Sequence, residues 1–163
     1  MGKERSYEII DIRKSIMREI VSSPELVKLL GFENEEYPED VIPFNKSFPH
    51  EYIPDTITTT DRFINFDIRA TSYNKNDVYK NVTIYFYIVC HQDVVRYEDK
   101  GRKYLWYDKV TCELDRIFSN QEHFGVGKMK LTDNTPYYPQ SKFKGRALTF
   151  KTLDYTDGKK YGR

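Results

Sequence analysis

RFINFDIRATSYNKNDVYKNVTIYFYIVCH, residues 62–91, contains two runs in which apolar and polar side chains alternate. The turn-forming residues 74–77, Asn-Lys-Asn-Asp, separate the two runs. Alternation with a period of two over this length predicts a long β-hairpin with one face on a core. The side chains expected on that face are Ile64, Phe66, Ile68, Ala70, Val82, Ile84, Phe86, Ile88 and Cys90.

The opposite face of the second strand is not a purely polar face either. It is expected to carry Tyr85, Tyr87 and Val89 beside Thr83. A sheet with apolar groups on both faces needs cover on both, and the helices expected elsewhere in the chain cover one. We therefore expect Tyr85, Tyr87 and Val89 to contact another subunit of an assembly.

Hydrophobic periodicity predicts two main helices and a short one. Isoleucines at helical spacing predict a helix over residues 9–21. Ser23-Pro24-Glu25 has the order of N-cap, first-turn proline and acid, which predicts a short helix that ends at Gly31. An apolar stripe predicts the second main helix over residues 103–119.

The C-terminal third predicts two further strands, over residues 125–132 and 147–155, with a turn or loop at 133–141. This element order indicates an α+β fold: a mainly antiparallel sheet with a long β-hairpin, and two main helices packed on one face. We expect a single domain over residues 1–155 and a polar, mobile tail at 156–163.

Residues 32–61 differ from the rest, because four prolines recur there among charged and aromatic residues. A segment of this length without helix or strand is usually functional or disordered, and its aromatic residues favour a segment that lies on another surface. Its anchors are Phe44, Phe48 and Tyr52, which we expect to lie on a neighbouring subunit.

Composition limits the classes of protein to consider. The 26 basic residues nearly balance the 25 acidic ones, for a net charge of +1, which disfavours a dedicated nucleic-acid binder. Two cysteines, Cys90 and Cys112, are expected to be buried free thiols in a reducing compartment. The N-terminus lacks a secretory h-region, and no apolar run reaches the ~20 residues of a membrane span, so a cytosolically made, soluble protein is expected.

Metal and catalytic motifs are weak. Cys90 and His91 are adjacent on a strand and point to opposite faces, so we expect no metal and no cofactor. The run Gly125-Val-Gly-Lys128 lacks the spacing of a phosphate-binding loop. The alternative is a small Mg-dependent nuclease, for which Asp67, Asp77 and Glu113 supply the carboxylates, although nothing in their spacing makes them converge.

A charged loop is expected over residues 96–103. It either contacts a phosphate backbone or an acidic partner, or is only a solvated connection, because Glu98 and Asp99 offset its positive charge. Its basic side chains are Arg96, Lys100, Arg102 and Lys103.

The order of elements resembles the α-β-β-α-β-β plan of the tail terminator and neck proteins of tailed bacteriophages. The resemblance covers most of residues 6–155. It is carried by the helix at 9–21, the hairpin segments INFDI (64–68) and VTIYF (82–86), the run LDRIF (114–118) followed by FGVGKM (124–129), and the closing strand FKGRALTF (143–150).

This resemblance implies a structural virion protein without catalysis. Such proteins form a ring, usually a homohexamer, at the head–tail junction, where they terminate the tail tube and join it to the head connector. The implied partners are the tail tube protein, connector or adaptor proteins, and genomic DNA that passes through the lumen without sequence-specific binding; no membrane is involved. The implied location is the virion neck, after assembly in the host cytoplasm. Tail terminator, tail completion and head-closure roles all stay open, as does a monomeric adaptor.

Overall fold

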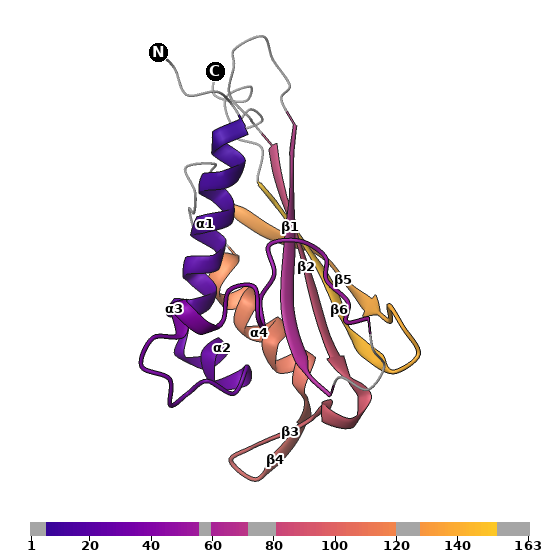
Figure 1. The fold of residues 1–163 in the computed structure, drawn as a ribbon. Coiled ribbons are helices and arrows are strands. Elements are labelled where there is room, and N and C mark those ends of the chain that lie inside the picture. The colour runs from indigo at the N-terminus through magenta and orange to yellow at the C-terminus, as the bar shows by residue number, and fades with distance from the viewer. Residues whose placement is uncertain (1–5, 56–59, 72–80, 120–127, 153–163) are drawn as a thin grey trace, which may run out of the picture.

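The computed structural model describes residues 6–55, 60–71, 81–119 and 128–152. Its described residues form one four-stranded antiparallel sheet in the order β1-β2-β6-β5 and a separate two-stranded hairpin (Figure 1). The strands are β1 (Arg62–Thr71), β2 (Asn81–His91), β3 (Arg96–Asp99), β4 (Arg102–Leu105), β5 (Met129–Tyr137) and β6 (Phe143–Thr152). The helices are α1 (Ser6–Ser22), α2 (Pro24–Leu29), α3 (Pro38–Val41) and α4 (Trp106–Phe118), with a 3-10 turn at Gln92–Val94.

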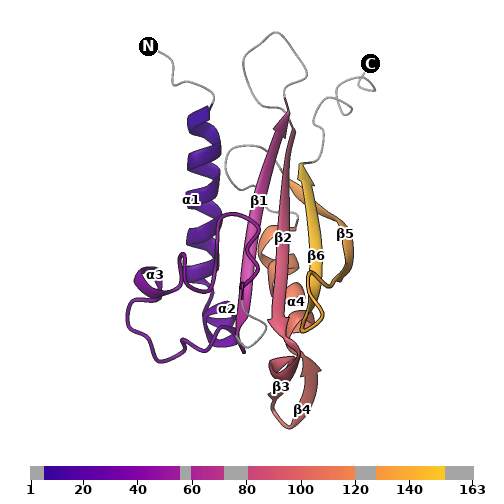
Figure 2. The same cartoon turned by 45° about the vertical axis from the view of Figure 1, so that its right-hand side comes forward.

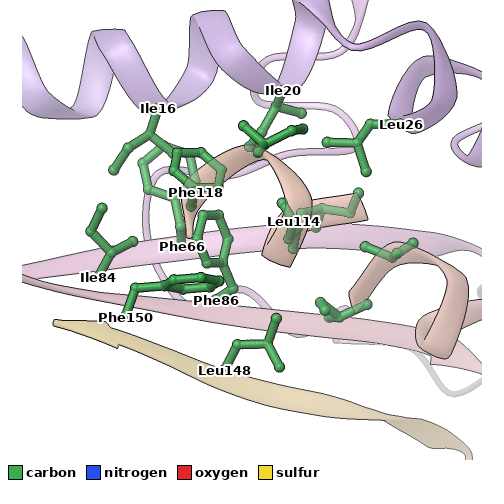
Figure 3. Close-up of a cluster of buried hydrophobic side chains, with 14 of the residues drawn as sticks. Ile16, Ile20, Leu26, Phe66, Ile84, Phe86, Leu114, Phe118, Leu148 and Phe150 are labelled. Atoms are coloured by element: carbon green, nitrogen blue, oxygen red, sulfur yellow. The ribbon is translucent and has the colours of Figure 1, made fainter. Parts of the chain in front are cut away.

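The predicted α+β class, with helices packed on one face of a mainly antiparallel sheet, is confirmed. β1 and β2 pair in the register that places Phe66 opposite Phe86, so the apolar residues of both strands share one face. Figure 3 shows this face meeting the helices, with the aromatic rings gathered between them. The ring centroids of Phe86 lie 5.1 Å from Phe118 and 5.7 Å from Phe150.

Local sequence signals account for the helix ends. Ser23 caps α2, because its Oγ accepts a hydrogen bond from the Leu26 N–H at 3.2 Å. Gly31 ends this region with a φ of 86°, a conformation that glycine adopts without strain. Trp106, the first residue of α4, donates its indole N–H to the Leu29 carbonyl at 2.7 Å and so ties α4 to α2.

The charged loop expected at 96–103 is instead the hairpin β3–β4, and α4 begins three residues later than predicted. Lys100 and Gly101 have φ values of 49° and 75°, and two successive positive values define the tight turn that suits a two-residue hairpin. Residues 103–105, which were expected to begin the helix, pair with β3 instead. Figure 2 shows the hairpin projecting beyond the end of the main sheet.

The last two strands also differ from their expected limits. The turn predicted at 133–141 is wrong in its first half, because β5 continues to Tyr137 through Pro136. A proline is tolerated there because β5 is an edge strand. β6 begins at Phe143 rather than at 147. Residues 74–77, 125–127 and 156–163, on which other expectations fell, lie outside the described residues.

Candidate interaction surface

A segment outside the helices and strands, residues 43–55, crosses the face of the sheet that faces away from α4; we call it the strap (Figures 1 and 2). It runs first along the edge of β1. The Ile64 N–H donates to the Lys46 carbonyl at 3.0 Å. The Phe66 N–H donates to the Phe48 carbonyl, also at 3.0 Å. These bonds satisfy backbone groups that an edge strand would otherwise expose.

The strap covers a second, smaller hydrophobic cluster on this outer face of the sheet. Phe63, Val89 and Phe143 are buried there, and Phe48 and Tyr52 of the strap pack against them. The rings of Phe48 and Tyr52 stack with centroids 3.9 Å apart. Tyr52 also meets Phe63 edge-on at 5.4 Å. The lower part of the outer face is therefore covered by the chain itself.

This cover corrects three expected subunit contacts. Val89 is 0% exposed, which removes it from the candidates for a contact with another subunit. Phe48 and Tyr52 lie on their own sheet rather than on a neighbour. The physical reason is that the strap is tethered to β1, and a tethered segment reaches a nearby apolar face at a high effective concentration.

Asn65 holds the strap in place. It stands on the outer face of β1 and is 0% exposed. Its side-chain oxygen accepts from the Phe48 N–H at 3.2 Å, and its amide nitrogen donates to the Tyr52 carbonyl at 2.9 Å. Both ends of the amide are therefore matched to backbone groups of the strap, as a buried polar group requires.

Replacing Asn65 with leucine is expected to lower the free energy of unfolding by about 2–6 kcal/mol, because two backbone groups of the strap lose their partners at a cost of about 1–3 kcal/mol each. Urea unfolding measures this change, and limited proteolysis should show earlier cleavage in residues 43–55. Asn34→Leu, the same substitution at an exposed position, is the control. Equal stability of the two variants would contradict the role given to Asn65.

Tyr85 and Tyr87 are half-buried on the outer face of β2. Tyr87 meets Tyr137 with ring centroids 5.4 Å apart, and the Tyr137 hydroxyl donates to the Glu51 carboxylate of the strap. Burial and the nearby carboxylate of Glu51 raise the pKa of both Tyr87 and Tyr137 above the usual value. Both phenols therefore stay protonated, and Tyr137 serves as a hydrogen-bond donor to Glu51. Tyr85 lines a hollow further along β2, to which no residue of the strap contributes.

Phe44 is the most exposed of the predicted anchors, at 67%. It sits in a tight loop closed by the Ile42 carbonyl, which accepts from the backbone N–H groups of residues 45, 46 and 47. Its φ of 59° is left-handed, a conformation that costs a non-glycine residue about 1–2 kcal/mol. Tyr37, just before α3, is a second exposed aromatic at 53%. The loop therefore holds a large apolar ring in water with a strained backbone.

The basic residues expected to contact DNA or a partner lie on the β3–β4 hairpin, and all four are exposed: Arg96, Lys100, Arg102 and Lys103. Cross-strand acids accompany them, since Glu98 faces Lys103 and Asp99 faces Arg102. Asp99 also pairs with Lys28 at 3.5 Å and with Lys109 at 3.9 Å. Two of the four basic residues of this hairpin therefore face an acid across its strands.

The carboxylates of the nuclease alternative do not come together. Asp67 is on the outer face of β1, where Arg13 pairs with it at 2.6 Å. Glu113 is on α4, on the other side of the sheet, where Ser23 and Arg116 donate to it at 2.9 and 2.5 Å. The hydrogen bond from Arg116 lowers the pKa of Glu113. Asp77 lies outside the described residues.

Within the described ranges, no cluster of three or more histidine, cysteine or acidic side chains has the arrangement of a metal site. Cys90 is buried, and burial raises the pKa of its thiol to about 12. His91 lies on the opposite face, where its Nδ1 accepts from the Asp93 N–H at 3.2 Å. Cys112 is exposed, contrary to the expectation of a buried thiol, because it falls beside the apolar stripe of α4 rather than in it.

Comparison with known proteins identifies the family. No helix among the described residues is long and apolar enough to cross a membrane. No curated protein matches the chain. The profile of one family, YomW, matches residues 23–152, a range that includes the strap and all six strands. Because this match covers most of the sequence, the chain belongs to the YomW family of phage-encoded proteins.

Proposed function

We propose that this chain is a structural protein of the phage particle, which forms a homo-oligomeric ring at the head–tail junction, terminates the tail tube and joins it to the head connector. Two findings support the proposal. The family is of phage origin. The order α1, β1–β2, α4, β5–β6 follows the plan of neck proteins that the sequence resembles, with the helices on one face and part of the other face left uncovered by the strap.

The observation that carries the proposed assembly is the loop that presents Phe44. Exposure of a phenyl ring and a left-handed backbone are both unfavourable for an isolated chain. The loop nevertheless holds Phe44 firmly, through three backbone hydrogen bonds to Ile42, whose own side chain is buried. A residue that costs stability and is held rigidly in solvent fits an anchor for a partner, because a preorganised aromatic loses little entropy on binding.

Subunit contact is therefore proposed through Phe44 and the second exposed aromatic, Tyr37, in place of the outer-face residues expected from the sequence. In a ring, such a contact is head-to-tail: the Phe44 loop of one copy meets a different surface of the next. The tail tube protein and the head connector are proposed to bind the two open sides of that ring. The proposed location of the assembled protein is the neck of the virion.

Deleting the gene from the phage is expected to give tails of irregular length that do not join heads, which negative-stain microscopy of lysates measures. Complementation with wild-type protein should restore joined particles. Phe44→Gly should not restore them, although the purified variant should unfold at the same temperature or higher, because glycine removes the strain at the left-handed position. Phe44→Tyr, which keeps the ring, is the control and should restore particles.

Joined particles with tails of normal length in the deletion strain would overturn the neck role. Full complementation by Phe44→Gly, with the neck role intact, would instead show that the subunits meet elsewhere.

A further inference from the structure

The end of the outer face that the strap does not cover, which we call the open end, carries a row of positively charged side chains. β1, β2, β6 and β5 place Arg69, Thr83, Lys151 and Lys130 side by side in register. Neighbouring strands are about 4.8 Å apart, so the row spans roughly 14 Å across the sheet. The three cations are exposed, and none of them forms an ion pair with another described residue.

One pair in this row is unfavourable by itself. Lys130 and Lys151 face each other directly across β5 and β6. Like charges at directly opposed positions destabilise a sheet. Proteins place residues in such unfavourable pairs mainly at functional sites. An anionic ligand that reduces the repulsion between Lys130 and Lys151 would explain why the pair is present.

Acidic groups nearby do not cancel the charge. Asp67, one row below Arg69, is engaged by Arg13 at 2.6 Å. Asp133, one row below Lys130, accepts a hydrogen bond from Thr132 at 3.3 Å. In these two rows of the sheet, three cations, Arg69, Lys130 and Lys151, therefore stand against two carboxylates, Asp67 and Asp133, and Arg13 pairs with the first of these.

A hollow of about 400 Å³ accompanies the row at this end of the sheet. Its lining is rich in hydroxyl and amide groups, which donate well to phosphate oxygens. Polar atoms make up the larger part of its exposed lining, and none of the large apolar side chains that the described residues expose lines it. The lining residues are Arg69, Thr71, Asn81, Val82, Thr83, Tyr85, Lys151 and Thr152.

We propose that this face, centred on Arg69, Lys151 and Lys130, contacts the phosphate backbone of double-stranded DNA without reading its sequence. An acidic protein is a poorer match, because protein partners bury large apolar anchors, and none of those that the described residues expose lies in the hollow. The β3–β4 hairpin is also a poorer match, because Lys103 and Arg102 each face an acid across its two strands, whereas Lys130 faces Lys151. That the ligand is DNA rests on the proposed neck function, in which the open face lines the lumen.

The test is fluorescence anisotropy of a random-sequence DNA duplex titrated with the full chain at several salt concentrations. Weak binding that salt suppresses is expected for the wild type. Each phosphate contact contributes about 0.9 to the slope of log K against log salt, so the double variant Lys130→Glu/Lys151→Glu should lower that slope by about 1.8. Its affinity should fall at least about tenfold at low salt.

The matched control is Lys100→Glu/Lys103→Glu, which makes the same change in net charge on the hairpin at the other end of the sheet. Its affinity should stay within about threefold of the wild type, since distant exposed charges are screened. Lys130→Gln checks the fold: it should weaken binding while unfolding at the same or a higher urea concentration, because it removes the like-charge pair.

Equal loss in the two double variants would show that only net charge matters and would overturn the proposal, as would no binding by the wild type at low salt. Equally tight binding to poly-glutamate or to vesicles of anionic lipid, through the same lysines, would reassign the surface to another polyanion. These outcomes are separate from those of the gene deletion. DNA binding by the purified chain together with normal tails in the deletion strain would overturn the neck role, but it would still support DNA binding by this surface.

Discussion

Replacing Gly145 with valine is expected to lower the free energy of unfolding by more than about 3 kcal/mol, toward the upper end of what overpacking costs. A Cβ at this position would lie 1.7 Å from the Ile88 carbonyl oxygen and 3.1 Å from the Val89 Cα. These are backbone atoms of β2, which cannot rotate away as a side chain would. The clash can therefore be removed only if β2 and β6 move apart beneath the strap, where the second hydrophobic cluster lies. Urea unfolding of the purified variant measures the change.

Ala147→Val is the control for this substitution. Ala147 stands on the same face of β6, opposite Tyr87, and is half-buried. This substitution adds two carbons to a side chain that already has its Cβ, and it is expected to change the free energy of unfolding by less than about 1 kcal/mol. If both variants lost the same stability, crowding against β2 would not be the reason for a glycine at 145.

Truncating Trp106 to alanine is expected to cost about 3–5 kcal/mol of unfolding free energy. Trp106 is 0% exposed, donates to the Leu29 carbonyl at 2.7 Å, and lies 5.6 Å beneath the Arg62 guanidinium. The variant loses buried area, a cation–π contact and the hydrogen bond that joins α4 to α2. Thermal and urea unfolding both report the loss.

Two companion substitutions separate these contributions. Trp106→Phe keeps most of the ring but leaves the Leu29 carbonyl without its donor, and should cost about 1–3 kcal/mol. Leu105→Ala, one residue earlier and largely exposed, should cost less than about 1 kcal/mol. A loss at Leu105 as large as that of Trp106→Ala would mean that the end of β4, rather than the indole, joins the helices.

The parts of the fold that sequence predicts well are those with a single periodic cause. Alternation in residues 62–91 predicts the β1–β2 hairpin because one face of both strands meets the same core, as the pairing of Phe66 with Phe86 confirms. Ser23-Pro24 marks the start of α2 because the cap is a local hydrogen bond. The β3–β4 hairpin was missed because its residues are mostly charged, and its one signal was the Lys-Gly turn.

The outer face could not be predicted, because its cover comes from a distant part of the chain. Phe48 and Tyr52 were expected to be anchors, but no local pattern tells whether an aromatic will lie on its own sheet or on another subunit. Asn65 looked like an ordinary polar position in an alternating strand. Its burial depends on the Phe48 N–H and the Tyr52 carbonyl, which precede it by 17 and 13 residues. The charge row Arg69–Lys151–Lys130 likewise exists only once β1, β6 and β5 are in register.

The position of the strap in the chain has a consequence for synthesis. The strap precedes the strand whose edge it covers, so residues 43–55 leave the ribosome before β1 does. The backbone groups of Ile64 and Phe66 emerge next to partners that are already available, whereas β2 and the strands beyond it follow later. Many nascent copies lie close together during translation. The edge of β1 that no other strand of the sheet covers is therefore paired with the strap, and it is shielded from pairing with a strand of another copy.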